Sequence, residues 1–356
     1  MSHGIPTAQR LPTDVPIQEI AGAPYEAGRE YGCRNMEPII GFLCHQIREK
    51  AKNRLFAREC WQELLEYSDT VSQFVRGMAE GTGISLEQAV LLLLHEELGH
   101  MHHCTAFGAT GSATIGGETL IGQNWDWTPA LYGWSQLWRL SMPGLPRMLC
   151  YGYPGFWAAA GINEAGLALV WTSSGVFPKV EPQPGVPTYA VIAEVLAQTS
   201  VAGAVAALER ARNAGCFIFF LADAGGALCV AEGWPLRKVY EYSETVIGRA
   251  NHYECAEAVT TSSQQIESKL KWRNDTGVRA RTMQEGLARL QDRIDETAAM
   301  DLLRLHNEGR NMSICRHPGT RRGCHTLDSL IANCTRRELL IARGYPCRHE
   351  FQRCRV

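Results

Sequence analysis

The sequence lacks several features that would assign it to a common functional class. No two of its 13 cysteines are spaced as C-x-x-C, so a zinc ribbon or a thioredoxin-like redox site has no support. The formal net charge is −2, and without a basic excess to neutralise phosphates we expect no nucleic-acid partner. Repeats and low-complexity segments are absent as well, and 45% hydrophobic and 20% charged residues are typical of a globular protein.

Long apolar runs are also missing. The leucine run Leu91–Leu94 leads directly into His95 and Glu96, so it is too short to span a bilayer. The opening residues MSHGIPTAQR do not show the basic and then apolar order of a secretory signal. We therefore expect a cytoplasmic protein with no membrane partner, whose thiols are mostly reduced. The cysteines near the end of the chain could still include a disulfide or a metal site; they are Cys315, Cys324, Cys334, Cys347 and Cys354.

The pattern of apolar residues changes at Cys104. Before it, apolar residues recur every three or four positions, which predicts helices up to about Gly99 after a short strand at Ile17–Ile20. One helix is expected over 85–98, because Ser85 and Gln88 form a capping-box pattern. After Cys104, short apolar runs alternate with glycine-rich turns, which predicts strands.

Further elements follow from the same patterns. Gly116–Glu118 and Asn163–Gly166 are expected to be hairpin turns. An alanine-rich helix over Tyr189–Asn213 and a polar helix over Gly277–Gln291 are predicted. Strands are predicted at Cys216–Ala222, Ala227–Glu232, Val246–Asn251, Thr326–Asn333 and Glu338–Ala342. The chain thus divides into a helical segment, residues 1–103, and a two-sheet body with helices, residues 104–356.

A zinc peptidase is one interpretation of the residues before Cys104. His95, Glu96 and His100 look like a metal-binding helix with a general base. However, the two histidines are five residues apart rather than four, which turns the second ring away by about 100° around the helix axis. No third ligand motif follows, so this interpretation stays the alternative.

A nucleophilic Cys104 is the other interpretation. A cysteine that begins a strand, followed by Thr105 and Ala106, is placed to attack the carbonyl carbon of His103. Hydrolysis of the resulting thioester would leave Cys104 as a new chain start. Its freed α-amine, with a pKa of about 8, would lie beside its own thiol and could act as the general base.

Motifs along the chain support this chemistry. In order, they read CTAF from Cys104, GQNWDW at Gly122–Trp127, GINEAGLA at Gly161–Ala168, ANHY at Ala250–Tyr253, and SICRHP from Ser313. Together with GYPC at Gly344–Cys347, they resemble the N-terminal-nucleophile (Ntn) hydrolases of the penicillin acyltransferase type. That group comprises the acyl-coenzyme A:6-aminopenicillanic acid acyltransferases and their bacterial relatives, the C45 cysteine peptidases. The resemblance covers roughly residues 18–350.

This resemblance implies a fold and a set of catalytic residues. The expected fold is α+β, a four-layer αββα sandwich. Self-cleavage would occur between His103 and Cys104, and the two fragments would stay associated. Cys104 would be the nucleophile, Asp126 would orient its amine or thiol, and Asn251 would stabilise the oxyanion. Arg316 would be a charge that holds Asp126 or the substrate.

The resemblance also implies the kind of substrate. The expected partner is a small acyl amide or acyl thioester, with water or an amine as acceptor. No cofactor is expected and no metal ligand is assigned, but acyl-coenzyme A is a potential co-substrate. The tryptophans suggest an apolar or aromatic acyl group, and a homo-oligomer remains open. Residues assigned to substrate binding are Asn124, Trp125, Trp127, Phe107 and Ser313. Two alternatives stay open beside the zinc peptidase: a dedicated amidohydrolase for a small N-acyl amino compound, and a non-catalytic member of the fold.

Overall fold

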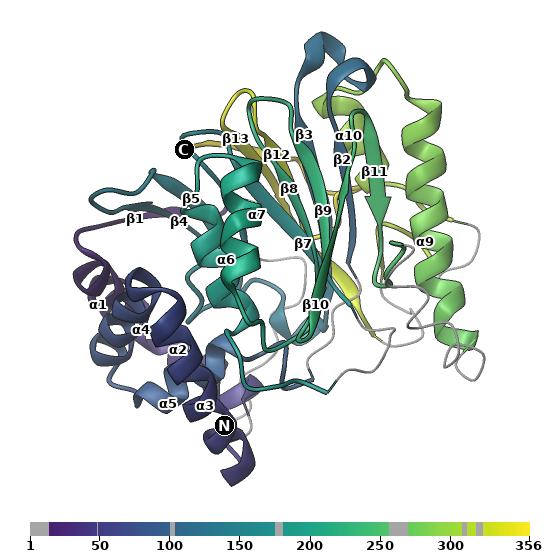
Figure 1. Ribbon diagram of the computed structural model, residues 1–356. Coiled ribbons are helices and arrows are strands. Elements are labelled where there is room, and N and C mark those ends of the chain that lie inside the picture. Colours follow the sequence, from purple (N-terminus) through teal and green to yellow (C-terminus); the bar gives the residue numbers. More distant parts are fainter. Residues whose placement is uncertain are drawn as a thin grey trace.

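The computed structural model describes residues 14–47, 49–99, 104–174, 181–255, 270–307, 312–317 and 323–356. Two stacked sheets form its centre, and helices cover their outer faces (Figure 1). The predicted four-layer αββα sandwich is therefore confirmed. Within the described residues, no helix combines the length and the apolarity needed to cross a bilayer.

The larger sheet has eight strands, in the order β1-β4-β5-β6-β7-β8-β9-β10. Neighbouring strands run antiparallel, except that β1 lies parallel to β4. Their bounds are β1 (Ile17–Ala21), β4 (Gln136–Ser141), β5 (Met148–Gly152), β6 (Ala160–Asn163), β7 (Ala168–Ser173), β8 (Phe217–Ala222), β9 (Leu228–Trp234) and β10 (Arg237–Tyr242).

The smaller sheet has six antiparallel strands, in the order β11-β2-β3-β12-β13-β14. Their bounds are β2 (Thr105–Ala109), β3 (Leu120–Trp127), β11 (Val246–Arg249), β12 (His325–Asn333), β13 (Glu338–Arg343) and β14 (Gln352–Arg355). The predicted turn after β2 is present, and two short 3-10 turns, Gly111–Ala113 and Ile115–Gly117, complete it. The turn at Asn163–Gly166 is confirmed between β6 and β7, where Gly166 has a φ of 88°.

Two pairs of helices form the outer layers of the sandwich. α6 (Thr188–Leu196) and α7 (Val201–Arg210) pack on the eight-stranded sheet. α9 (Leu270–Arg289) and α10 (Glu296–Leu303) pack on the six-stranded sheet, on the opposite side of the molecule (Figure 1). The helices before Cys104 gather beside α6; they are α1 (Pro24–Arg34), α2 (Met36–Gln46), α3 (Ala51–Tyr67), α4 (Asp69–Thr82) and α5 (Leu86–Leu93).

Several predicted helix limits were wrong. The helix expected over Tyr189–Asn213 is two helices, because Ser200 caps a new start at α7 through its side-chain oxygen. The capping box of Ser85 and Gln88 is present, but α5 ends at Leu93 rather than continuing to Leu98. The polar helix begins earlier than predicted, at Leu270. The strands β10 and β14 and the helix α10 were not predicted.

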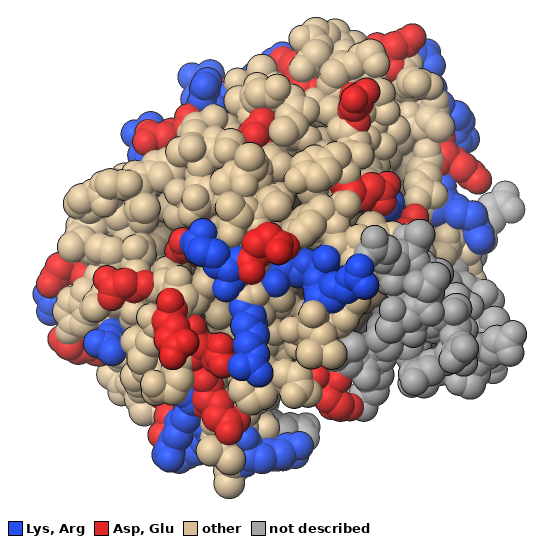
Figure 2. Space-filling view, in the orientation of Figure 1, with Lys and Arg blue, Asp and Glu red and all other residues tan. Residues whose placement is uncertain are grey.

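The segment before Cys104 is part of the same body as the rest of the chain. Its strand β1 forms a ladder with β4, and Tyr67 of α3 donates a hydrogen bond to the carbonyl of Ala207 in α7. Arg212 and Glu63 form an ion pair across the same boundary. Figure 2 shows acidic and basic side chains interspersed over one face of the molecule, and not a large field of one sign.

Candidate active site

Cys104 directly precedes β2, with its thiol in the core between the two sheets. Only 2% of the residue is exposed, and it belongs to the same apolar cluster as Ala106 and Trp125. Thr105 points to the other face of the strand, toward α9, as the alternation along a strand requires. Burial raises the pKa of the Cys104 thiol well above its ordinary value; the carboxylate of Asp126 raises it further, and a hydrogen bond to the Asp126 backbone opposes both.

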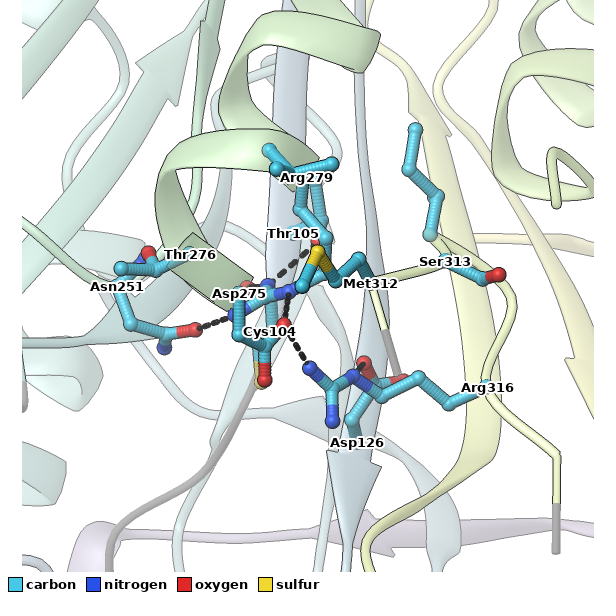
Figure 3. Close-up of polar contacts among 12 residues, drawn as sticks. Cys104, Thr105, Asp126, Asn251, Asp275, Thr276, Arg279, Met312, Ser313 and Arg316 are labelled. Carbon is cyan, nitrogen blue, oxygen red and sulfur yellow. Dashed lines mark hydrogen bonds and ion pairs between the residues drawn. The ribbon is translucent and has the colours of Figure 1, made fainter. Parts of the chain in front are cut away.

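Arg279 holds the main chain at Cys104. This side chain of α9 is fully buried. One terminal nitrogen, Nη1, donates to the carbonyl of Cys104 at 2.6 Å and to Oγ1 of Thr105 at 2.8 Å. The other, Nη2, donates to Oδ1 of Asn251 at 2.8 Å, and Nε donates to Asp275 at 2.9 Å. A single guanidinium thus joins the predicted nucleophile to the predicted oxyanion donor (Figure 3).

Asp126 belongs to a second group of charged side chains, next to the pair of Arg279 and Asp275. Its carboxylate accepts a hydrogen bond from Thr326 at 2.6 Å and is 3.3 Å from Nε of Arg316. Arg316 also pairs with Asp275, which in turn pairs with Arg279, so the two arginines share one carboxylate. Burial raises the pKa of Asp126 to about 7, although Arg316 and Thr326 oppose the shift. Burial also opposes ionisation of Asp275, but Arg279 and Arg316 together lower its pKa.

Asn251 is held rigidly after β11. Its Nδ2 donates to the carbonyl of Ser173 at 2.8 Å, and its backbone N–H donates to Thr276. Because a guanidinium only donates, the bond from Arg279 fixes which end of the amide is the oxygen. The side chain is fully buried, and these bonds fix its orientation.

Three residues that the sequence assigned to the substrate lie elsewhere. Phe107 lies on the opposite face of β2 from Cys104, in the core formed with α9 and α10. Asn124 donates to the carbonyls of Leu303 and Ile314 and accepts from Ser329, so its amide ties the α10 layer to β3. Ser313 accepts a hydrogen bond from the backbone of Asn307. Each of the three thus has protein contacts of its own, and its assignment to substrate binding stays a prediction.

Six of the nine tryptophans fall into two groups. Trp125, Trp127 and Trp171 belong to an aromatic cluster with Tyr153 and Tyr189, on the face of β3 and β7 that Cys104 shares. The others pack against the N-terminal helices: Trp134 on Phe42, Trp138 on Tyr31 and Trp157 on Phe74. Only the first group lies near the candidate nucleophile.

The zinc-peptidase alternative loses the helix that it requires. α5 ends at Leu93, and His95 and Glu96 follow in turns. The imidazole of His95 is fully buried and lies edge-on to Trp127, with ring centroids 4.8 Å apart. His100 and the predicted cleavage residue His103 lie outside the described residues.

Sequence reasoning missed Arg279, Asp275 and Thr326. The helix that carries Arg279 was predicted as polar, and a polar helix suggests an exposed arginine. The available signal was the four-residue spacing of Asp275 and Arg279, which suits an ion pair on one face of a helix. That spacing does not reveal that both side chains point toward Cys104.

Comparison with known proteins identifies the family. Residues 114–344, more than half of the chain, match the family described as acyl-coenzyme A:6-aminopenicillanic acid acyl-transferase. The chain belongs to this family. The match includes Asp126, Asn251 and Arg316, but it begins ten residues after Cys104. Membership supports an acyltransferase or amidohydrolase of the Ntn type, acting on C–N bonds of small acyl compounds.

The solved structures that match this chain are distant from it in sequence. Penicillin V acylase from Agrobacterium tumefaciens is 15% identical, with a TM-score of 0.45 over 67% of this chain and 83% of that chain. A variant of the conjugated bile acid hydrolase from Clostridium perfringens is 12% identical, with a TM-score of 0.46 over 71% of this chain and 97% of that chain. No curated protein matches the sequence.

Proposed function

We propose that this chain is a self-processing cysteine hydrolase or acyltransferase in which Cys104 is the nucleophile. The observation that carries the proposal is the position of Cys104 at the start of a central strand. Its carbonyl is fixed by Arg279, which also binds Asn251, and Asp126 lies nearby. Positioned groups of this kind are what an acyl transfer needs: a nucleophile, a charged partner and an amide donor.

Maturation would occur at the bond between His103 and Cys104. The thiol sulfur bonds to the carbonyl carbon of His103, the C–N bond breaks, and the thiol proton passes to the leaving nitrogen. Water then attacks the thioester carbon, which leaves a carboxylate on His103 and restores the thiol. One water is consumed, and Cys104 gains a free α-amine.

In turnover, that amine would take the proton of its own thiol while Asp126 orients it. The sulfur attacks the carbonyl carbon of an acyl amide or acyl thioester, and Asn251 donates an N–H to the oxyanion. Collapse expels the amine or thiol and leaves an S-acyl enzyme. Water or a second amine then takes the acyl group, so no cofactor is required, and acyl-coenzyme A would enter only as a thioester donor.

Two structural features support details of this proposal. The β1–β4 ladder and the contacts of α3 with α7 would keep the two fragments together after cleavage. The aromatic cluster around Trp125, Trp171 and Tyr153 favours an apolar or aromatic acyl group.

Intact mass under denaturing conditions tests the proposal. We expect two fragments that divide at His103 and Cys104, with a combined mass one water above that of the chain. The Cys104→Ala variant should remain one uncut chain. Cys150→Ala, which removes another fully buried thiol, serves as the matched control and should be cut normally. A single uncut wild-type chain after long incubation would overturn the proposal.

Activity should also depend on the ionisation of Asp126. Since its pKa lies near 7, the carboxylate fraction grows as the pH rises through that value. Below pH 7 both Asp126 and the free α-amine of Cys104, whose pKa is about 8, are mostly protonated, so we expect kcat/KM for a hydrolysed acyl amide to fall there by up to about a hundredfold per pH unit. In Asp126→Asn, activity should be low, and only the fall of about tenfold per pH unit caused by the α-amine should remain. If the variant keeps the wild-type limb, Asp126 is not the group that titrates.

A further inference from the structure

Four potential metal ligands converge next to Arg316. His306 follows α10, Cys315 and His317 flank Arg316, and Cys347 lies in the turn after β13. One ligand atom from each lies within 4.8 Å of every other. Three separate parts of the chain thus direct two imidazole nitrogens and two sulfurs into the same small volume.

Four of the six distances between these atoms are close to the edges of a metal-centred tetrahedron, and the two from His306 to the sulfurs lie within 4.8 Å. With zinc bonds of about 2.3 Å to sulfur and 2.0 Å to nitrogen, tetrahedral edges are about 3.8 Å for S–S, 3.5 Å for S–N and 3.3 Å for N–N. Here the Cys315 and Cys347 sulfurs are 3.6 Å apart, and the His306 and His317 nitrogens are 3.0 Å apart. Nε2 of His317 is 3.5 Å from the first sulfur and 3.1 Å from the second.

We infer that these four side chains form a structural zinc site. Two thiolates and two imidazoles in a tetrahedron favour zinc over magnesium or calcium, which prefer oxygen ligands. Four protein ligands leave no open position, so the ion would hold the fold together and would not act in catalysis. The site shares no residue with the zinc-peptidase alternative, which uses His95, Glu96 and His100.

The surroundings of the site are organised to hold its ligands. The ring of His317 stacks on Tyr345, with centroids 4.3 Å apart, and the Tyr345 hydroxyl lies 3.2 Å from Nδ1 of His325. Arg304 donates to the carbonyl of Pro346, next to Cys347. These contacts restrain the ring of His317 and the main chain next to Cys347.

A disulfide between Cys315 and Cys347 is the competing explanation. The two sulfurs are 3.6 Å apart, far beyond the covalent length of about 2.05 Å. A disulfide would also leave the convergence of His306 and His317 without a role. The pair of imidazoles therefore favours the metal.

The site would hold Arg316 in place. Both neighbours of Arg316 would be metal ligands, while its guanidinium pairs with Asp126 and its backbone N–H donates to Thr326. Loss of the metal would release Cys315 and His317, the residues on either side of Arg316. This connection to activity rests on the proposed function, whereas the metal site itself does not.

Metal analysis of the purified, untagged full-length protein tests the inference. We expect about one zinc per chain in the wild type and in Cys324→Ser, and almost none in Cys347→Ser or His317→Ala. Cys324 is the matched control because it is a half-buried thiol of the same C-terminal region outside the cluster. After chelation, cobalt(II) added to the wild type should give the intense visible absorption of a tetrahedral thiolate centre. The cobalt experiment needs no variant and no enzymatic activity.

Two results would overturn the inference. One is a wild-type protein without metal that fails to bind added zinc or cobalt. The other is a metal-free protein in which peptide mapping without reductant finds Cys315 linked to Cys347. Neither result bears on cleavage at Cys104, so the failure of this inference is distinguishable from failure of the proposed function.

Discussion

Replacing Arg279 with methionine is expected to lower the free energy of unfolding by about 3–5 kcal/mol, the usual cost of breaking a buried ion pair. The substitution leaves the carbonyl of Cys104 and the side-chain oxygen of Asn251 without their donor, and it removes one of the two cations beside Asp275. A loss of this size is a large fraction of the total stability of a domain, which is about 5–15 kcal/mol. We also expect the remaining folded protein to be cut very slowly, since the main chain at the nucleophile loses its anchor.

Urea denaturation and a time course of intact mass measure both effects. Arg281→Met is the matched control, because Arg281 lies two residues further along α9 and is exposed. It should change neither the denaturation midpoint nor cleavage. The denaturation midpoint and the cleavage rate of Arg279→Lys should lie between those of Arg279→Met and Arg281→Met. An ammonium keeps the charge but cannot reach all four acceptors in one plane. If Arg279→Met has the midpoint and the cleavage rate of the control, Arg279 does not organise the site.

Much of the fold follows from local patterns. The alternation of apolar runs and glycine turns after Cys104 predicts most strands, because strands covered by the other sheet on one face and by helices on the other are continuously apolar. The break between α6 and α7 is harder to predict, since no glycine or proline marks Gln198–Ser200. The strand β10 is half-exposed and charged, so only its pairing with β9 reveals it.

The sequence alone predicts only some of the residues of the candidate site. Asp126, Asn251 and Arg316 were predicted because motifs carry them, and the structure brings all three into one charged network around Arg279. Strand alternation alone predicts that Phe107 and Cys104 face opposite sides of β2, since they are three positions apart. No local rule predicts that Arg279 is buried, because its acceptors come from strands and loops far apart in the sequence.

Replacing Asn251 with alanine is expected to reduce kcat about 100- to 1,000-fold, the usual effect of removing one oxyanion donor. The loss should appear in kcat more than in KM, because the oxyanion exists only after attack on the carbonyl. The same donor would stabilise the oxyanion formed on His103 during maturation. Uncut precursor should therefore accumulate in this variant, and its half-life can be followed by intact mass without a known substrate.

Asn251 also contacts Arg279 and Ser173, so a structural effect must be separated from a catalytic one. Asn163→Ala is the matched control: this amide is equally buried, bonds to the carbonyls of Leu196 and Gln198, and lies at the turn after β6, away from Cys104. It should lower the melting temperature at least as much as Asn251→Ala but leave cleavage and kcat of the folded enzyme within a few fold. If the two variants lose stability and cleavage in the same proportion, Asn251 acts only through the fold. If Asn251→Ala alone stalls cleavage at a comparable melting temperature, its amide is the donor that the reaction requires.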